Sequence, residues 1–394
     1  MKSIPNKKIA FLEFVENMPP RRILFRRTLE EVGYTVTPIY WNRENSNNCT
    51  HTEEPQVHLQ AGKMAPSLLL MMPSLWRGQW RWLRKLSPKV IVAGHFFLLP
   101  LAIAWRLYHG WKQVHIFYDA IEHFAQHFSS YFGPLQKIAY PFLVMSENVG
   151  AALCSGVLAV DSRDDRIERR LRRCNRQTIV IWNVPSKKDD PEIEQVESLK
   201  GKYSGRKVVA FVGGLMKEKG VRTAIEVAAM VKERYDKFLV LFIGPIMDDP
   251  DSIHNLIQSK GVEDNVLFLD PIPCEETVAH LRHSQMGLAL HQQDLCHRNL
   301  SAGNGRKFFA YMQAGIPIVG PSFGEVGKAV EMADCGILVD TEKANIVAKA
   351  IIHLLDNPKE AQRLGLNGRR AFEARFNWER ESKKFELFMQ HILK

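Results

Sequence analysis

The 394-residue sequence lacks a paired-cysteine motif: its six cysteines are scattered and no two form a C-x-x-C pair. In a chain of this length, that spacing excludes a disulfide-built scaffold and predicts reduced thiols in a reducing compartment. The first nine residues are polar and lack the apolar core of a signal peptide, so we expect a protein of the cytoplasmic side. The longest apolar stretch, residues 90–105, is interrupted by His95 and Pro100 and is shorter than the roughly 20 residues of a membrane span. We interpret it as a strand followed by a helix.

Two further absences exclude function classes. No G-x-G-x-x-G follows the first apolar run at residues 11–14, which argues against an NAD-dependent dehydrogenase. No nucleic-acid-binding module is recognisable, and the aromatic residues are not arranged as a stacking platform, so we expect no nucleic-acid partner. The formal charge of +10 and the basic clusters of the N-terminal half instead suit phosphorylated ligands or acidic lipids.

What the sequence does contain is an alternation of short runs rich in Val, Ile and Phe with segments of helical period, the pattern of α/β folds with parallel sheets. We predict strands in the first half near residues 8–14, 35–39, 89–93, 113–118, 156–160 and 178–182. In the second half we predict them near residues 208–212, 238–243, 266–269, 286–290, 317–319 and 336–339. Length also favours two domains, since single cores rarely grow beyond about 250–300 residues. We expect domains at residues 1–184 and 207–370, a polar linker at 185–206 and a terminal helix at 371–394.

The strongest local signal follows the predicted strand at residues 208–212. Gly213 and Gly214 let backbone amides approach an anion closely, Lys217 and Lys219 add positive charge, and a helix begins at Val221. Two glycines are weak evidence alone, and a plain turn with solvated lysines is the alternative. A second segment, residues 304–319, opens a helix with a small basic loop. Its candidate anion-binding residues are Asn304, Gly305, Arg306 and Lys307.

Both segments resemble the family-four retaining glycosyltransferases of the GT-B type. Residues 211–220 are similar to the family's V-G-R-L-x-x-x-K-G loop, residues 306–319 to its K-L-x-E-Y-M-A-x-G-x-P-V-V signature, and residues 336–340 to its G-L-L-V-x strand. In the other half, residues 20–36, 116–122 and 179–183 resemble its first helix and second strand, its V-x-Y-D-x-H-E segment and its V-I-x-N segment. Residues 376–378 resemble the F-S-W that begins its terminal helix. The resemblance covers nearly the whole chain.

The resemblance implies two Rossmann-like doubly wound domains facing a central cleft, with the terminal helix crossing back to the first domain. It implies a nucleotide-sugar donor in the C-terminal domain, retention of anomeric configuration, and no metal or other cofactor. The sequence departs from the family at several positions. Gly214 stands where the family has a phosphate-binding arginine, Ala310 and a position near Ala302 stand where it has the E-x7-E glutamates, and Ile121 replaces a histidine. Arg306 and Lys307 are our candidates to replace the missing positive charge.

Candidate catalytic residues follow strands of the N-terminal half. Asp119 and Glu122 are the acids best placed to orient an acceptor hydroxyl. His95 is a candidate contact to the transferred sugar, with a helix-start histidine as the alternative. A zinc site at His291, Asp294, Cys296 and His297 is disfavoured because no second ligand pair lies at zinc spacing.

Residues 64–86 combine apolar residues and tryptophans with arginines, which suits an anionic membrane surface; a core helix with a basic edge is the alternative. We therefore expect a glycosyltransferase that moves a sugar from a nucleotide donor to a lipid-linked or cell-envelope polysaccharide acceptor, with peripheral membrane contact. The alternative is a nucleotide-sugar-binding homologue with lapsed or epimerase-like activity, which the missing glutamates favour. Donor sugar, nucleotide base, linkage and oligomeric state are not specified by the sequence.

Overall fold

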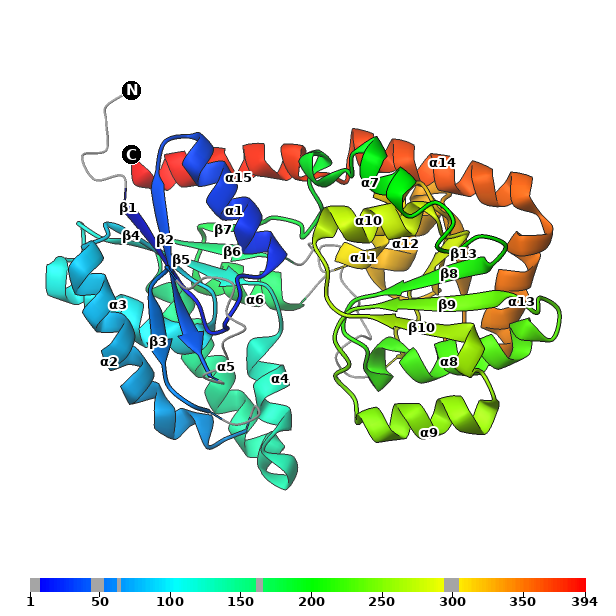
Figure 1. Cartoon of the computed structure of the whole chain (residues 1–394). Helices are drawn as coiled ribbons and strands as arrows, with labels where there is room; N and C mark the ends of the chain where they lie inside the picture. Colours follow the sequence, from blue (N-terminus) through cyan, green and yellow to red (C-terminus); the bar gives the residue numbers. More distant parts are fainter. Residues whose placement is uncertain (1–7, 44–52, 62–64, 161–165, 294–304) are drawn as a thin grey trace. The chain divides into compact units, whose positions relative to one another are not determined.

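A computed structural model describes residues 8–43, 53–61, 65–160, 166–293 and 305–394. The chain divides into two compact units, each an α/β layer structure (Figure 1). The N-terminal unit contains residues 1–182 together with residues 381–394, and the C-terminal unit contains residues 183–380.

The N-terminal unit is built on a seven-stranded sheet of order β3-β2-β1-β4-β5-β6-β7, in which every pairing is parallel. Its strands are β1 Lys8–Leu12, β2 Thr35–Asn42, β3 Gln56–His58, β4 Val90–Ala93, β5 His115–Ala120, β6 Gly156–Ala159 and β7 Thr178–Val180. All four residues of β4 and of β6 are buried, as expected for strands covered by helices on both faces.

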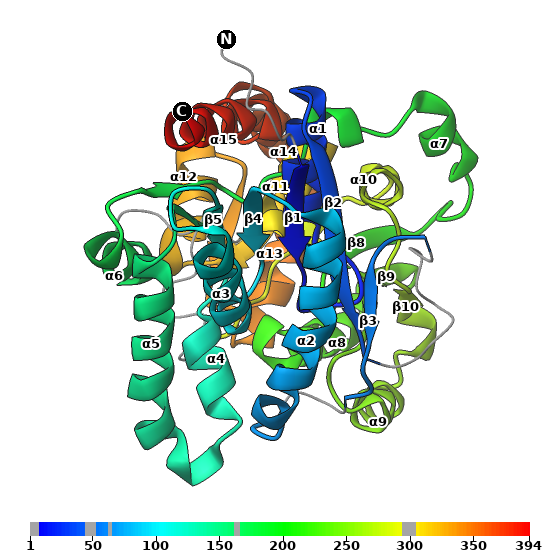
Figure 2. The ribbon, with the colours of Figure 1, turned by 90° about the vertical axis from the view of Figure 1, so that its left-hand side faces the viewer.

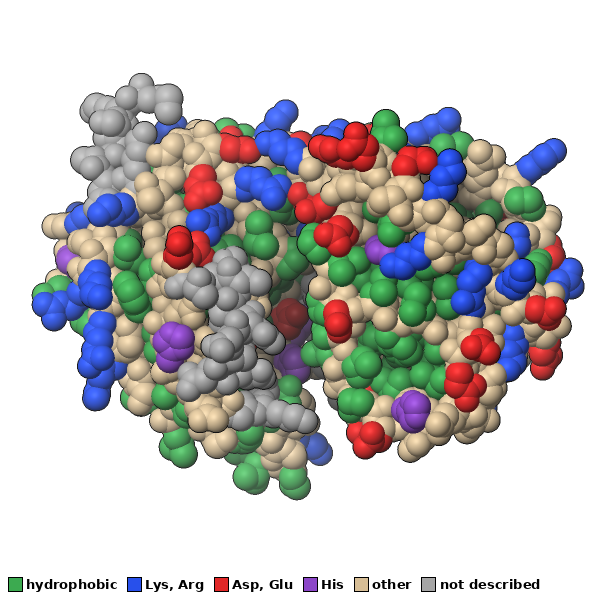
Figure 3. Space-filling model, viewed as in Figure 1, with side chains coloured by type: hydrophobic (Ala, Val, Ile, Leu, Met, Phe, Trp, Pro, Cys, Tyr) green, Lys and Arg blue, Asp and Glu red, His purple; other side chains and the backbone are tan. Residues whose placement is uncertain are grey.

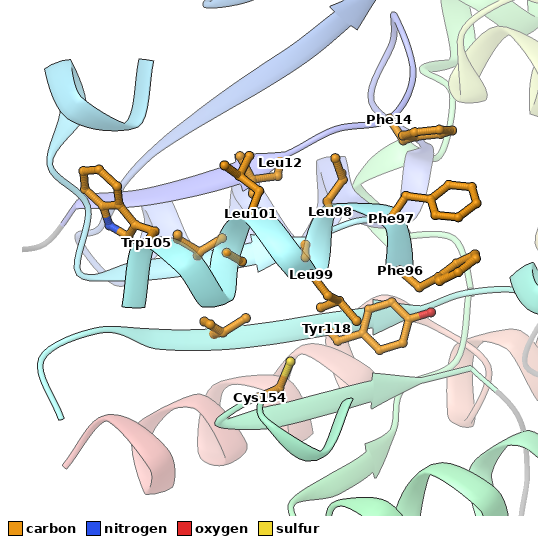
Figure 4. Packing of buried hydrophobic residues seen from close by; sticks show 14 of the residues in the cluster. Leu12, Phe14, Phe96, Phe97, Leu98, Leu99, Leu101, Trp105, Tyr118 and Cys154 are labelled. Carbon is orange, nitrogen blue, oxygen red and sulfur yellow. The ribbon is translucent and has the colours of Figure 1, made fainter. Parts of the chain in front are cut away.

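Helices enclose this sheet. They are α1 Pro20–Glu31, α2 Leu68–Leu86, α3 Leu99–His109, α4 Phe124–Ser130, α5 Gln136–Ala152, α6 Arg166–Cys174 and the final helix α15 Trp378–Leu393. Figure 2 shows α2, α3, α4 and α5 on one side of the unit, with α4 and α5 forming a projecting hairpin. Figure 4 shows the core under this side, where residues of α3 meet residues of β1, β5 and the end of α5.

The C-terminal unit has a six-stranded parallel sheet of order β10-β9-β8-β11-β12-β13. Its strands are β8 Lys207–Val212, β9 Phe238–Ile243, β10 Val266–Leu269, β11 Met286–Leu288, β12 Ile318–Pro321 and β13 Gly336–Val339. Its helices are α7 Ile193–Ser198, α8 Val221–Lys232, α9 Pro250–Lys260, α10 Cys274–Arg282, α11 Arg306–Ala314, α12 Gly324–Ala333, α13 Ala344–Asp356 and α14 Pro358–Ala374. The strand order places β8 and β11 beside each other at the centre, where the order reverses. Ligands of such sheets bind beyond the carboxyl ends of the strands at this point.

The segment expected to be a linker is instead folded onto the C-terminal unit. Asp190 forms ion pairs with Arg282 at 2.9 Å and with Arg369 at 2.8 Å, and α7 lies within the segment. Its polar composition therefore reflects these ion pairs and a surface position.

The fold class predicted from the sequence is confirmed: both sheets are parallel and helices alternate with strands. Each of the twelve predicted strands coincides with a strand of the structure. The short edge strand β3 was missed because three residues carry no readable alternation. No helix among the described residues is both long and apolar enough to cross a membrane.

Candidate functional site

The loop that follows β8 has a backbone that only glycine adopts easily. Gly213 has φ +106° and Gly220 has φ +84°, both in the region that side chains disfavour. A Cβ on Gly220 would lie 2.1 Å from the carbonyl oxygen of Leu290, so the start of α8 packs directly on the chain beyond β11. The loop therefore lies beyond the carboxyl ends of β8 and β11, the position at which parallel sheets bind ligands.

Helix α11 is anchored over this loop by Tyr311, a fully buried residue. The Tyr311 hydroxyl donates to the carbonyl oxygen of Leu288 at 2.8 Å and accepts from the amide of Val212 at 3.1 Å. The same ring fills the space beside Gly287, where a Cβ would lie 2.3 Å from it. One side chain thus connects β8, β11 and α11, and it fixes the first turn of α11 against the glycine loop.

That first turn directs Lys307 onto the loop. Its Nζ lies 4.6 Å from the centroid of the Phe211 ring, and its Cε lies 3.8 Å from where a Cβ on Gly213 would be. Although the residue as a whole is partly exposed, Nζ is buried, and none of the described residues accepts a hydrogen bond from it. Burial, and then the positive charge of Lys219, hold the pKa of Lys307 well below its usual value. A buried ammonium without an acceptor is costly, so this arrangement suits an anion.

The other predicted anion-binding residues lie as follows. Lys219 Nζ would be 3.5 Å from a Cβ on Gly214, so Lys219 and Lys307 converge on the two glycines. Lys217 is exposed on the short turn before α8. Gly305 is the N-cap residue of α11, and Asn304 lies outside the described residues, as does Ala302.

Arg306 has a different environment from Lys307. Its guanidinium donates to the carbonyl oxygen of Val184 at 3.4 Å and to Cys274 Sγ at 3.2 Å. These contacts direct Arg306 toward α10 and the start of the unit. Of the two candidates for the missing positive charge, the geometry therefore favours Lys307.

In the N-terminal unit, His95 caps the short 3₁₀ turn before α3, since its Nδ1 accepts from the amide of Phe97 at 3.3 Å. The imidazole stacks on Phe14, with centroids 4.4 Å apart, and contacts Phe124 at 4.2 Å. Burial, with the charges of Arg22 and Arg43 adding to it, holds the pKa of His95 well below its usual value. His95 is therefore neutral at physiological pH, and the proton is on Nε2 because Nδ1 is an acceptor.

Asp119 is completely buried in a cluster of charges. Its Oδ1 is 3.0 Å from Arg21 Nε and its Oδ2 is 3.2 Å from Arg22 Nη1, and Arg22 also pairs with the buried Glu13 at 2.8 Å. Arg21 donates to the carbonyl oxygens of Ile181 and Ala159. This is the setting of a structural ion pair, which the sequence pattern alone could not distinguish from an acid open to an acceptor.

Glu122, in contrast, is half exposed just beyond β5. Its carboxylate lies 3.9 Å from Nδ1 of the equally exposed His127. Of the two predicted acids, Glu122 is thus the one whose surroundings leave it accessible to a ligand.

The interpretation of the tryptophans of residues 64–86 as membrane-anchoring side chains needs correction. Leu68, Met72 and Leu75 of α2 are buried, and the three tryptophans pack partly buried against the core. Their ring nitrogens find partners within the unit: Trp76 donates to Phe97 and Trp82 to Gln56, both at backbone carbonyls. Helix α2 is a core helix with an exposed basic edge, which is the alternative given for it from the sequence.

Of the disfavoured zinc ligands, only His291 is among the described residues; it is buried and stacks on Phe308 at 5.9 Å. Asp294, Cys296 and His297 lie outside them. Within the described ranges, no three His, Cys, Asp or Glu side chains are grouped as a metal site.

Comparison with known proteins identifies a family model and several relatives that this chain is similar to. Residues 192–371 match the family model described as "Glycosyl transferases group 1". The chain is 30% identical over 164 residues to D-inositol 3-phosphate glycosyltransferase of Corynebacterium glutamicum (strain R), covering 40% of this chain and 37% of that protein. It is 24% identical over 187 residues to a GDP-mannose-dependent alpha-(1-6)-phosphatidylinositol monomannoside mannosyltransferase of Mycobacterium tuberculosis (strain H37Rv), covering 47% and 48%. The match thus spans less than half the length of either relative.

Among solved structures, Anabaena HepE in complex with UDP-glucose superposes with a TM-score of 0.71 at 15% identity, covering 98% of this chain and 99% of that one. A similarity at this identity concerns the fold. It extends over both units and confirms the GT-B architecture that the sequence resemblance implied.

Proposed function

Because residues 192–371 belong to the glycosyl transferases group 1 family, we propose that the chain is a nucleotide-sugar-dependent glycosyltransferase whose donor diphosphate binds the Gly213–Gly214 loop. The observation that carries the proposal is Lys307: its buried Nζ faces this loop without a hydrogen-bond acceptor among the described residues, and Lys219 lies close by. Backbone amides of the loop and the N-terminus of α8 add further positive potential.

In the proposed reaction, the bond between the sugar's anomeric carbon and the diphosphate oxygen breaks. An acceptor hydroxyl bonds to that carbon and passes its proton to the departing diphosphate oxygen. Lys219 and Lys307 stabilise the negative charge that develops on the departing diphosphate, which is often the largest catalytic contribution. Following the family resemblance, we propose retention of configuration and a mechanism that needs no metal.

We propose a lipid-linked or cell-envelope polysaccharide acceptor, reached at the cytoplasmic face of a membrane. Two of the relatives are named for inositol phosphate and phosphatidylinositol mannoside acceptors. On the acceptor side, Glu122 is proposed to orient the acceptor hydroxyl and neutral His95 to donate through Nε2 to a sugar oxygen. Asp119 is proposed as a positioning residue that holds α1 against the strand ends.

The alternative function, a nucleotide-sugar-binding homologue without transfer activity, is favoured by a single observation. Ala310 stands on α11 where the family has its second glutamate, so a contact to the donor is absent. Transfer and donor-hydrolysis assays with a panel of nucleotide sugars separate the two functions: binding without turnover of any donor supports the alternative.

The donor site is tested by thermal unfolding of the full chain with UDP, GDP, ADP and TDP. We expect at least one diphosphate to stabilise the protein, and Lys307→Met to bind it roughly 10- to 100-fold more weakly, because a charge-assisted contact is lost. Lys349→Met, at an exposed position of α13, is the matched control and should bind like the unmodified chain.

A rescue variant sharpens this test. Gly214→Arg restores the family's arginine, and a Cβ there would meet the flexible Met247 Sδ at 2.5 Å, which is on a 60% exposed side chain that can move. We expect Gly214→Arg to recover diphosphate binding in the Lys307→Met background. If Lys307→Met binds every diphosphate as tightly as the unmodified chain, the proposed site is wrong.

A further inference from the structure

The α4–α5 hairpin of the N-terminal unit carries large apolar side chains on its outside. We define the hairpin face as Tyr131, Leu135, Ile138, Phe142, Met145 and Val149. Each is exposed by more than a third, and Ile138 and Phe142 reach 61% and 63%. Exposed apolar residues are ordinary when scattered, but a contiguous group of them marks an interaction surface.

The face is continuous because of helical geometry. Ile138, Phe142, Met145 and Val149 are spaced four, three and four residues apart in α5 and so lie along one side of it. They cover about 16 Å of the helix axis. The opposite side of α5 is buried against the unit at Glu147, Gly150 and Ala151, so the helix cannot rotate to bury the hairpin face.

Charge indicates what covers this surface. Residues 55–146 contain nine Lys or Arg and only two acids, Asp119 and Glu122. Asp119 is buried between Arg21 and Arg22 and contributes nothing to the surface. This stretch of the chain, which includes both α2 and the α4–α5 hairpin, therefore has an excess of positive charge. A second copy of the chain would bring like charges together, whereas anionic lipid headgroups complement them.

Helix α2 contributes to the same surface. Leu70, at its start, is 84% exposed, and Arg77, Arg81 and Arg84 are exposed along one side. In both ribbon views the start of α2 and the turn of the α4–α5 hairpin lie at the same end of the N-terminal unit (Figures 1 and 2). Figure 3 shows hydrophobic side chains gathered at that end and Lys and Arg side chains along the adjoining edge of α2 and α3.

We propose that the hairpin face docks on an anionic bilayer, with the apolar residues of α5 entering the interface and the basic edge of α2 contacting headgroups. The inference rests on the proposed function for one point only: a lipid-linked acceptor gives a reason for the chain to dock on a membrane. It places the membrane-entering residues on the α4–α5 hairpin, whereas the tryptophans of α2 pack inside. The combination of an apolar face and flanking basic residues is that of a reversible interfacial anchor.

The test is co-sedimentation of the full chain with vesicles of phosphatidylcholine, with and without phosphatidylglycerol, at low and high salt. We expect binding that requires phosphatidylglycerol and weakens with salt. The double variant Ile138→Asp/Phe142→Asp should lower the partition onto vesicles by roughly tenfold or more. Leu387→Asp is the matched control: its parent residue is 68% exposed on α15, in the same unit, and binding should be unchanged.

Three outcomes would overturn the proposal. They are no vesicle binding at low salt, equal binding by the double variant, or a dimer in light scattering that the double variant dissociates while neither protein binds vesicles. Circular dichroism and diphosphate-induced stabilisation of the double variant show that it is folded. If the unmodified chain binds vesicles but binds no diphosphate, that result contradicts the proposed donor site and leaves the membrane proposal standing.

Discussion

Lys307 illustrates a conflict between stability and binding within a single residue. Holding a proton on Lys307 Nζ is costly in the folded chain, because Nζ is removed from water and has no acceptor among the described residues, and because Lys219 adds repulsion. A bound diphosphate would supply the missing negative charge. The same residue is therefore expected to weaken the empty protein and to strengthen the complex.

This conflict predicts a pH-dependent stability difference. Because the pKa of Lys307 is depressed in the folded state, the unfolded chain binds a proton that the folded chain does not, at any pH between that depressed value and 10.5. Stability of the unmodified chain is thus lost as pH falls through this window. Lys307→Met removes the effect and should raise the free energy of unfolding by about 1–3 kcal/mol near neutral pH, with no gain above pH 10.5.

Urea unfolding of both proteins across this pH range, without nucleotide, measures the difference. Lys349→Met again serves as the control: its free energy of unfolding should differ from that of the unmodified chain by the same amount at every pH. A Lys307→Met variant that is less stable near neutral pH would show that the ammonium has a partner in the protein.

The contacts of individual side chains, such as those of Lys307, cannot be predicted from the sequence pattern. Arg306 and Lys307 are adjacent in the sequence and equally basic, yet one contacts Val184 and Cys274 and the other lies over Phe211. The direction of each side chain depends on how α11 is rotated, which Tyr311 sets through bonds to β8 and β11. The sequence indicated the loop and the helix that form the candidate site, but not which side chain faces the loop.

At the scale of elements, helix α1 is held to the N-terminal sheet by charge. Arg21 and Arg22 connect it to Asp119 of β5, to Glu13 just after β1, and to Ala159 at the end of β6. Buried ion pairs contribute little net stability when complete, but an uncompensated charge left in such a cluster is expensive.

We therefore expect Asp119→Asn to lower the free energy of unfolding by about 3–5 kcal/mol, because two buried guanidinium groups lose their shared carboxylate. Glu122→Gln, half exposed in the following turn, should change it by less than about 0.5 kcal/mol while reducing transfer activity. Denaturant unfolding and transfer assays on both variants give the comparison. An Asp119→Asn protein of unchanged stability but lost activity would show that Asp119 acts on the substrate instead.

The positions of the strands could largely be predicted from the sequence, whereas the contacts that side chains make between elements could not. The buried runs of β4, β8 and β9 gave correct strand positions because continuous burial needs continuous apolar residues. The tryptophans of α2 were misinterpreted because indole rings suit both a membrane interface and a partly buried core with a polar contact. Only the carbonyl groups of Phe97 and Gln56, distant in sequence, decide between the two.

At the scale of the whole molecule, the C-terminal residues complete the N-terminal unit. Phe385 of α15 is fully buried and stacks on Phe25 of α1 with centroids 4.4 Å apart. The amide of Trp182 donates to Glu381 at 2.9 Å, and Phe388 lies against Phe117 of β5. The final helix thus covers one side of the first sheet.

Phe385→Ala should destabilise the N-terminal unit by about 3–5 kcal/mol through the cavity that it leaves. Because Phe385 makes its contacts within that unit, we expect the diphosphate-stabilised transition of the C-terminal unit to be unchanged. Calorimetry with and without diphosphate can assign the two transitions. Leu387→Asp, exposed on the same helix, is the control, and an equal shift of both transitions would mean that the units unfold together.

The return of α15 also has a consequence for the order of synthesis. The N-terminal unit begins at the first residues but needs residues 381–394, so the ribosome must translate the entire C-terminal unit before the first can close. At ordinary translation rates this interval lasts roughly 10 to 40 seconds. During this interval, the apolar surface around Phe25 and Phe117 remains exposed on the nascent chain, and a chaperone could bind there until α15 is synthesised.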